Sequence, residues 1–152
     1  MKNLILILFL IFLNSCGYTS VYKNQKLKDF QITVLEMTGD KEFNNLIKNE
    51  LKLNSNINSI NKYEISLNSN YQKITTSKNS AGVDTDYKIL ANTRVTINLN
   101  NKNIILNFSE NINIKSNSNS FEQNNYERNI KKNFASSIKD KFIIKLFSID
   151  DN

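Results

Sequence analysis

Few side chains in this sequence could carry out chemistry, and their types exclude most catalytic machinery. The 152-residue chain has no His and one Cys, so it cannot form a Ser-His-Asp site, an intrachain disulfide or a zinc site built on several thiolates. Asp84-Thr85-Asp86 could suggest a metal loop, but no Gly or Glu follows at calcium-loop spacing. A hydrolase using Ser and Lys stays open as an alternative, because both types are abundant. We expect a protein that is not an enzyme and needs no cofactor.

The single thiol, Cys16, stands where covalent lipid attachment is expected. The unbroken apolar run Leu4 to Leu13 is too short for a membrane-spanning helix, which needs about 20 apolar residues. It has the length of a signal-peptide core. Leu13-Asn14-Ser15-Cys16 then has the pattern of a bacterial lipoprotein cleavage box. We therefore expect residues 1–15 to be a signal peptide and Cys16 to be the lipid-attachment residue.

Residues 16–29 have little hydrophobic periodicity, and we interpret them as a lipidated cysteine and tether. Two or more acyl chains hold a protein stably to a bilayer, whereas one chain does so only marginally. Gly17, rather than Asp, follows the cysteine. The absence of Asp at that position favours the outer membrane over retention at the inner membrane.

The remaining sequence, 30–149, predicts one α+β domain. Alternation predicts a strand over 30–35, the Thr38-Gly39-Asp40 segment predicts a turn and a helix N-cap, and apolar spacing predicts a helix over about 41–53. Three long alternating segments follow, beginning near Tyr63, Tyr87 and Ile104. A closing helix over about 121–147 repeats an apolar residue every four positions, in the stripe Tyr126, Ile130, Phe134, Ile138, Phe142 and Leu146.

The element order is therefore β-α-β-β-β-α, which requires a crossover between the first two, parallel strands and antiparallel hairpins after them. We predict a two-layer sandwich with both helices packed on one face of a four-stranded mixed sheet. A two-residue turn at Asn101-Lys102 would pair Leu99 with Ile104 and Ile97 with Leu106. Ser120 and Gln123 fit a capping box at the start of the closing helix.

The other face of the predicted sheet is rich in amides. Its members are Ser66, Asn68, Asn70, Lys88, Asn92, Arg94, Thr96, Asn98, Asn107, Ser109, Asn111 and Asn113, with Leu90 and Ile105 as the few apolar ones. Such a face is either simply solvated or a wet, hydrogen-bonded contact surface. The net charge of +6 favours an anionic partner. The signal segment argues against nucleic acid and favours a phosphorylated glycolipid or an anionic membrane surface.

The chain resembles the LptE family of LPS-assembly lipoproteins over nearly its whole length. The resemblance rests on Cys16-Gly17-Tyr18 after the box, the β-α start, three long strands and a closing amphipathic helix that opens near Tyr126. The Cys-Gly-aromatic start followed by Val21-Tyr22 resembles the start of the mature chain in the alphaproteobacterial branch of the family. The proline that usually stands near Ser20 in that branch is absent here.

The resemblance implies a non-enzymatic outer-membrane lipoprotein. Proteins of this family plug the lumen of the β-barrel LptD, help it to assemble and contact LPS on its way to the cell surface. Lys88 and Arg94, which we expect to point outward from the sheet, are candidate contacts for lipid A phosphates. The alternative is a periplasm-facing lipoprotein that binds a soluble protein partner.

Overall fold

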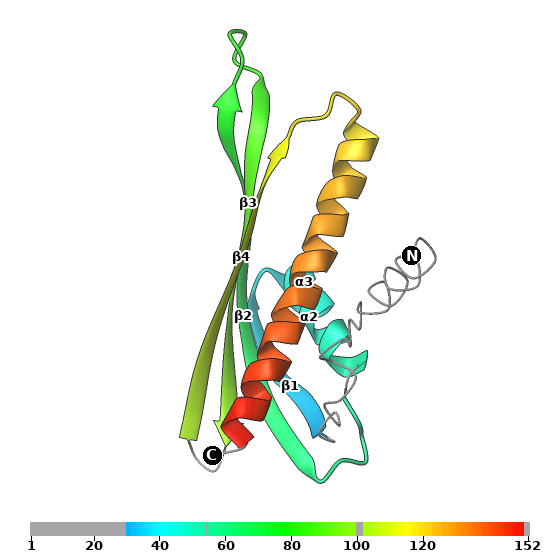
Figure 1. Cartoon of the computed structure of the whole chain (residues 1–152), viewed down its shortest axis with the longest axis vertical. Coiled ribbons are helices and arrows are strands. Elements are labelled where there is room, and N and C mark those ends of the chain that lie inside the picture. The colour runs from blue at the N-terminus through cyan, green and yellow to red at the C-terminus, as the bar shows by residue number, and fades with distance from the viewer. Residues whose placement is uncertain (1–29, 54, 100–101, 151–152) are drawn as a thin grey trace, which may run out of the picture.

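The computed structural model describes residues 30–53, 55–99 and 102–150. The predicted signal peptide, the lipid-attachment residue Cys16 and the tether lie outside these residues. The elements in chain order are β1 (Phe30–Gly39), α2 (Lys41–Leu53), β2 (Asn61–Lys78), β3 (Asp84–Leu99), β4 (Lys102–Lys115) and α3 (Ser120–Asp150). The strands form one sheet in the order β1-β2-β3-β4, and both helices lie on the same face of it (Figure 1). The predicted α+β sandwich is confirmed.

The sheet is longer than the part that β1 and α2 occupy. β1 runs parallel to β2 and pairs only with residues 61–69 of it. Beyond that point β2 and β3 continue as an antiparallel hairpin to the loop 79–83, well past α2 (Figure 1). We call the end with the first residues of β1 the base and the end with the loop 79–83 the tip.

The turn between β1 and α2 depends on Gly39 and Asp40, as predicted. Gly39 has a φ of +84°, and an added Cβ would lie 2.0 Å from the carbonyl oxygen of Ser69, so a side chain has no room there. Asp40 Oδ1 accepts a hydrogen bond from the Phe43 amide at 2.7 Å, which caps the helix. The sequence therefore stops the strand and starts α2 within two residues.

β1 continues past the predicted end at residue 35 because a bulge absorbs Leu35. The register pairs Val34 with Ile65 and Glu36 with Ser66, leaving Leu35 without a partner on β2. Leu35 is exposed, and Met37 then packs against the core beside its partner Leu67. One extra residue thus keeps the apolar side chains on both sides of the bulge facing the helices.

The predicted register of the β3–β4 hairpin is wrong by two residues. Leu99 pairs with Lys102, Ile97 with Ile104 and Val95 with Leu106, so Lys102 already belongs to β4 and not to the turn. Because side chains alternate with a period of two, this shift leaves every residue on its predicted face and changes only its partner.

The predicted capping box at the start of α3 is also wrong. Asn119 is the cap, since its Oδ1 accepts hydrogen bonds from the amides of Phe121 at 3.0 Å and Glu122 at 3.3 Å. Gln123 Oε1 instead accepts a hydrogen bond from the Asn117 amide at 2.9 Å. Several Asn and Ser residues compete for the cap in this segment, and the helix begins one residue earlier than predicted.

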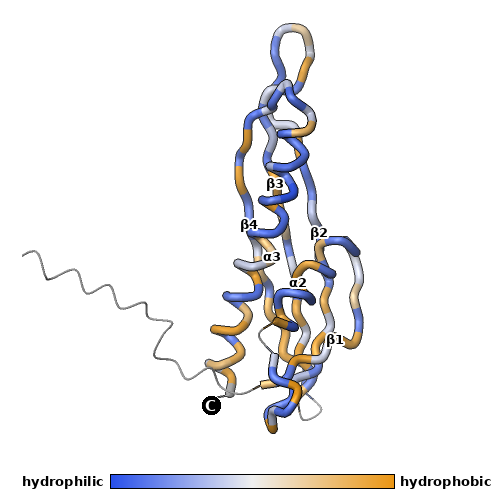
Figure 2. The backbone as a smooth tube through the Cα atoms, turned by 90° about the vertical axis from the view of Figure 1, so that its right-hand side faces the viewer, coloured by the Kyte–Doolittle hydropathy of each residue, from blue (hydrophilic) through white to orange (hydrophobic). Residues whose placement is uncertain are grey.

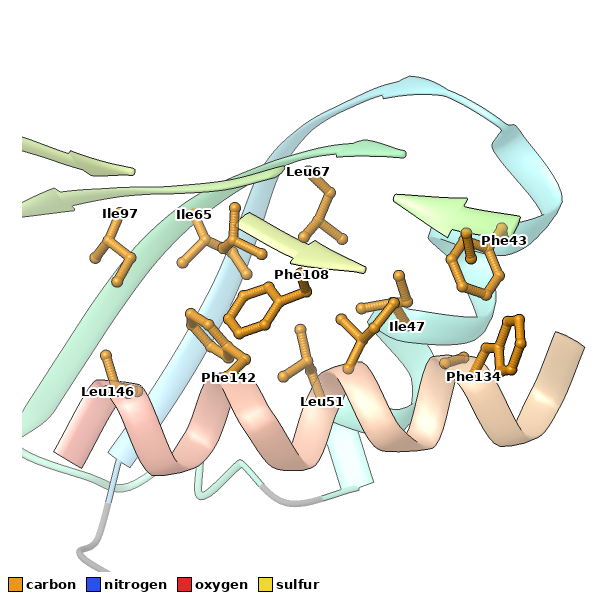
Figure 3. Packing of buried hydrophobic residues seen from close by; sticks show 14 of the residues in the cluster. Phe43, Ile47, Leu51, Ile65, Leu67, Ile97, Phe108, Phe134, Phe142 and Leu146 are labelled. Atoms are coloured by element: carbon orange, nitrogen blue, oxygen red, sulfur yellow. The ribbon is translucent and has the colours of Figure 1, made fainter. Parts of the chain in front are cut away.

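The core lies between the helices and the sheet, towards the base (Figure 3). Five of the six predicted stripe residues of α3 are buried, whereas Tyr126, nearest the tip, is exposed. Phe142 packs edge-on against Phe108 with ring centroids 6.4 Å apart. The buried apolar residues of the sheet and α2 complete the layer: Phe43, Ile47, Leu51, Ile65, Leu67, Ile89, Val95 and Ile97.

Candidate functional site

The strands present many of their polar residues on the face that no described helix covers. We call the amide face the outward residues of β2, β3 and β4 that are exposed there. The register aligns them in rows, because residues paired across the strands point to the same side. Asn68, Arg94 and Asn107 form one row, and Asn70, Asn92 and Ser109 form the next. The other exposed amides on β3 and β4 are Asn98, Asn103, Asn111 and Asn113.

These two rows enclose a shallow hollow of about 360 Å³, lined by Asn68, Asn70, Asn92, Thr93, Arg94, Asn107, Phe108 and Ser109. The Arg94 Nε donates a long hydrogen bond of 3.4 Å to Asn107 Oδ1. The guanidinium therefore lies along the sheet, beside amides that can each donate and accept. Such a surface can bind an oxygen-rich partner through many individually modest hydrogen bonds, with one cation for a negative group.

The structure places both predicted anion-contact residues on this face but does not bring them together. Lys88 lies on β3 opposite Ile74 and Asn113, and Arg94 lies three rows away. Six residues along a strand separate them by about 20 Å at roughly 3.3 Å per residue. They cannot share one phosphate, although they could contact two charged groups of one extended partner.

The basic residues of α3 are partly neutralised by acidic side chains of the same chain. Three of the six that the sequence suggested as a cationic group have acidic partners: Lys131 contacts Glu42 at 2.7 Å, Lys139 contacts Asp140 at 2.5 Å and Lys141 contacts Glu110 at 2.5 Å. The Ser137 hydroxyl also donates to Glu110. The helix is therefore a weaker candidate for an anion-binding surface than its composition indicates.

Sequence reasoning missed a polar group between α3 and the sheet near the tip. Lys73 Nζ contacts Glu127 Oε1 at 2.5 Å and lies 3.9 Å from the centre of the Tyr87 ring. Lys131 lies 4.5 Å from the centre of the Tyr71 ring. The alternation of β2 signals that Tyr71 and Lys73 face the helices, but no short-range pattern identifies Glu127 as a partner.

Tyr71 is the one described residue whose acidity clearly changes. Burial raises the pKa of its hydroxyl to about 12, with smaller contributions from the carboxylates of Glu127, Asp40 and Glu42. Its hydroxyl is buried and has no hydrogen-bond partner among the described residues. A raised pKa makes this phenol a poorer base or nucleophile at neutral pH, so the group has no evident catalytic use.

Other kinds of site find little support in the described ranges. Among those residues, no three or more of His, Cys, Asp and Glu gather where a metal ion could be held. The described helices include none that is long and apolar enough to cross a membrane. The amide face is consequently the strongest candidate for function in this part of the chain.

Solved structures of bacterial lipoproteins share this architecture. Rare lipoprotein B from Shewanella oneidensis superposes with a TM-score of 0.57 at 14% identity, over 78% of this chain and 96% of that one. A lipoprotein from Caulobacter crescentus gives 0.56 at 13% identity, over 79% and 88% of the two chains. The minor lipoprotein from Acinetobacter baumannii gives 0.51 at 11% identity, over 78% and 94%.

No protein-family model matches the sequence, and no curated protein matches it either. At 11–14% identity the solved structures are evidence for a common fold and for nothing finer. The shared region covers almost all of each solved chain, so the likeness concerns the whole domain and not a single motif. The chain thus has the fold of these solved bacterial lipoproteins.

Proposed function

We propose that this chain is a lipid-anchored lipoprotein of the cell envelope with an LptE-like, non-enzymatic role at the outer membrane. Two independent features support the proposal. The lipoprotein box ends at the only cysteine of the chain, Cys16. The described domain has the fold of rare lipoprotein B and of two further bacterial lipoproteins.

The partner we propose is an LptD-type β-barrel whose lumen the domain enters. The observation that carries this step is the amide face, with two aligned rows of Asn, Ser and Arg side chains and a shallow hollow between them. The interior wall of a large outer-membrane barrel is polar, so a domain inside it needs a surface that exchanges hydrogen bonds with that wall. An apolar surface would leave the polar groups of the wall unsatisfied.

The ligand we propose is LPS, contacted through its negatively charged groups. Arg94 lies exposed among amides, where a guanidinium can hold a phosphate in a two-pronged geometry. Lys88, about 20 Å along the same strand by the roughly 3.3 Å rise per residue, can only contact a second charged group. Arg94 is therefore the more important of the two in this proposal.

Co-purification of the tagged full chain from outer membranes tests the proposal. The wild-type chain should capture a large β-barrel in a one-to-one, detergent-resistant complex that carries LPS. The amide-face double variant Asn92→Trp/Asn107→Trp should lose the barrel, because two indole rings would fill the hollow. The matched control Asn133→Trp changes the same residue type at an exposed site on α3 and should keep it.

Each other result has a definite meaning for the proposal. Failure of the wild-type chain to capture a barrel would refute the plug, and capture of a soluble protein instead would favour the periplasm-facing alternative. Equal capture by the double variant and the control would remove the amide face from the interface. Cys16→Ala should release the chain from membranes that lack the barrel; continued pelleting with such membranes would contradict the lipid anchor.

A further inference from the structure

The loop between α2 and β2 holds a group of exposed apolar side chains at the base. Leu53 is 82% exposed at the end of α2, and Ile57 and Ile60 are 77% and 95% exposed in the segment that follows. Single exposed apolar residues are common on protein surfaces, but here three lie within eight residues of one connection, and we call these three the apolar patch. The patch belongs to a segment otherwise made of Asn and Ser, where the sequence offers polar residues freely.

Hydrogen bonds hold this loop in place, so its exposed residues are presented by a structured turn. The Asn58 amide donates to Asn56 Oδ1 at 3.0 Å and the Ser59 amide donates to the Asn56 carbonyl at 3.1 Å. Ser59 itself is buried, and its hydroxyl accepts a hydrogen bond from the Asn61 amide at 3.1 Å. Ile57 and Ile60 therefore point to solvent although the backbone around them is tied down.

The same loop is bonded to the first described residue of the domain. The Asn56 amide donates to the Phe30 carbonyl at 2.8 Å, and the Ile32 amide donates to Ser55 Oγ at 2.9 Å. Phe30 directly follows the segment 16–29, which on the proposed function leads from the acylated cysteine. The loop that carries the apolar patch thus lies beside the first residues of β1 (Figure 1), which directly follow the segment 16–29 in the sequence.

The length of that segment sets how far the patch can be from a bilayer. A segment of 14 residues spans at most about 48 Å when it is fully stretched. The tip lies farther away, because the 18 residues of β2 extend about 55 Å at roughly 3.3 Å per residue. An anchor at residue 16 therefore confines the base, but not the tip, to the neighbourhood of the membrane surface.

The charges around the patch suit an anionic bilayer. Lys52 and Lys62 are exposed on either side of it, and no acidic residue stands between them in the sequence. The preceding segment adds Lys23, Lys26 and Lys28. Apolar side chains that enter the acyl boundary, with lysines at the level of the headgroups, are typical of peripheral membrane contacts.

We infer that Leu53, Ile57 and Ile60 form a second, non-covalent membrane contact that inserts into the interface of an anionic lipid bilayer. The inference rests on the lipid anchor of the proposed function for its placement. The contact orients the domain, with its base at the membrane surface and its long sheet free to enter the barrel lumen of the proposed function. Acyl chains alone would hold the protein without fixing that orientation.

Tryptophan fluorescence on vesicles can test this contact, because the chain contains no Trp of its own. Ile60→Trp places a probe in the patch, and Val83→Trp places the matched control in the tip loop, where Val83 is 60% exposed. The full acylated chain would be bound to vesicles of phosphatidylethanolamine and phosphatidylglycerol with brominated acyl chains. We expect a blue shift and strong quenching for Ile60→Trp and neither for Val83→Trp.

A second measurement separates the patch from the anchor. On the full mature chain carrying Cys16→Ala, binding to the same vesicles should be weak, and Ile57→Asn/Ile60→Asn should weaken it by about tenfold for each side chain. If Cys16 proves unacylated, the lipid anchor of the proposed function is refuted, but this measurement still tests whether the patch binds a bilayer. An acylated, vesicle-bound chain with an unquenched Ile60→Trp probe would overturn the inference and leave the anchor standing.

Two other results would also overturn the contact. Equal quenching of the Ile60→Trp and Val83→Trp probes would mean that the domain has no fixed orientation on the bilayer. A blue shift of the Ile60→Trp probe without vesicles, increasing with protein concentration, would assign the patch to a second copy of the chain.

Discussion

The layer between α3 and the sheet is held together in two different ways along its length. Towards the base, in the apolar half, Phe134, Ile138, Phe142 and Leu146 pack onto the inner face of the sheet together with α2. Towards the tip, in the polar half, Glu127 and Lys131 contact Tyr71 and Lys73 through ion pairs and ring contacts. Figure 2 shows the same change along α3, which is hydrophilic near its start and hydrophobic near its end.

The difference follows from the number of elements that cover the sheet. Near the base, α2 and α3 lie side by side on the strands, so apolar side chains can be enclosed completely. Beyond residue 69, β2 has no β1 neighbour, and α3 lies over a narrower sheet with only the start of α2 beside it, where Phe43 packs on Tyr71. There, the ammonium groups of Lys73 and Lys131 lie over the rings of Tyr87 and Tyr71, and each also pairs with a carboxylate. The polar half also buries Ile89, Ile114 and Ile130. We conclude that the apolar half still supplies most of the stability, because it encloses the larger apolar cluster and because partly exposed ion pairs contribute about 0–1 kcal/mol each.

The largest effect should come from removing a ring in the apolar half. Phe142→Ala should lower the free energy of unfolding by about 3–5 kcal/mol, because Phe142 is buried against Phe108 and its loss leaves a cavity. Tyr126→Ala, on the same helix where the ring is half exposed, should change it by less than about 0.5 kcal/mol. Urea unfolding of the two variants measures this contrast, and similar losses would contradict the division into two halves.

Substitution of the two glycines with positive φ should likewise cost more stability at the turn before α2 than in the tip loop. Gly39→Ala should be the more damaging, because the new Cβ meets the Ser69 carbonyl oxygen at 2.0 Å and the backbone must move. Gly82 in the tip loop has a similar φ of +79°, but nothing lies within 4 Å of its added Cβ. Gly82→Ala should therefore lower the free energy of unfolding by only about 1–2 kcal/mol, which is the intrinsic cost of a positive φ for a residue with a Cβ. Thermal unfolding decides the comparison; a larger loss at Gly82 would show that the tip is packed more tightly than these contacts indicate.

Local sequence signals were sufficient for most of the fold. The Gly39-Asp40 pair fixes a turn and a cap, and alternation in β2, β3 and β4 assigns the inner and outer faces correctly. The hairpin register was predicted wrongly because the pattern fixes which face a residue takes but not its partner, and a two-residue shift satisfies it equally well. The helix cap was predicted wrongly because Asn117, Asn119 and Ser120 are all suitable caps, and only their geometry separates them.

The candidate sites also differ in whether a local sequence pattern predicts them. The amide face was predictable, since it needs only the alternation of three strands. The hollow around Arg94 depends on which residues share a row, and the register error hid it. The Lys73–Glu127 pair joins residues 54 positions apart, and the patch at the base depends on how the 55–60 loop folds back onto β1. Neither leaves a periodic signal in the sequence, because both arise from tertiary contacts.

The smallest effect should be found in the polar half, at Tyr71. Its hydroxyl has no partner among the described residues, so Tyr71→Phe should change the free energy of unfolding at pH 7 by less than about 0.5 kcal/mol. The contrast should appear only in alkali, because the pKa of Tyr71 is about 12 in the folded protein and about 10 in the unfolded chain. Below pH 10 both states hold the proton and the stabilisation is complete. Between about pH 10 and 12 the unfolded state releases it first, so stability falls as the pH rises.

For a partly exposed residue such as Tyr71, this fall in the free energy of unfolding should be on the order of 1 kcal/mol after solvent screening. The Tyr71→Phe variant has no phenol at this position and should not show the fall. Urea unfolding at pH 7 and pH 11, with the absorbance of tyrosinate followed in parallel, measures both effects. The difference titration of wild type and variant should show one tyrosine ionising near pH 12. A midpoint near pH 10 would mean that water reaches the Tyr71 hydroxyl freely, and that α3 near the tip covers the sheet less closely than its contacts with Lys73 and Tyr71 require.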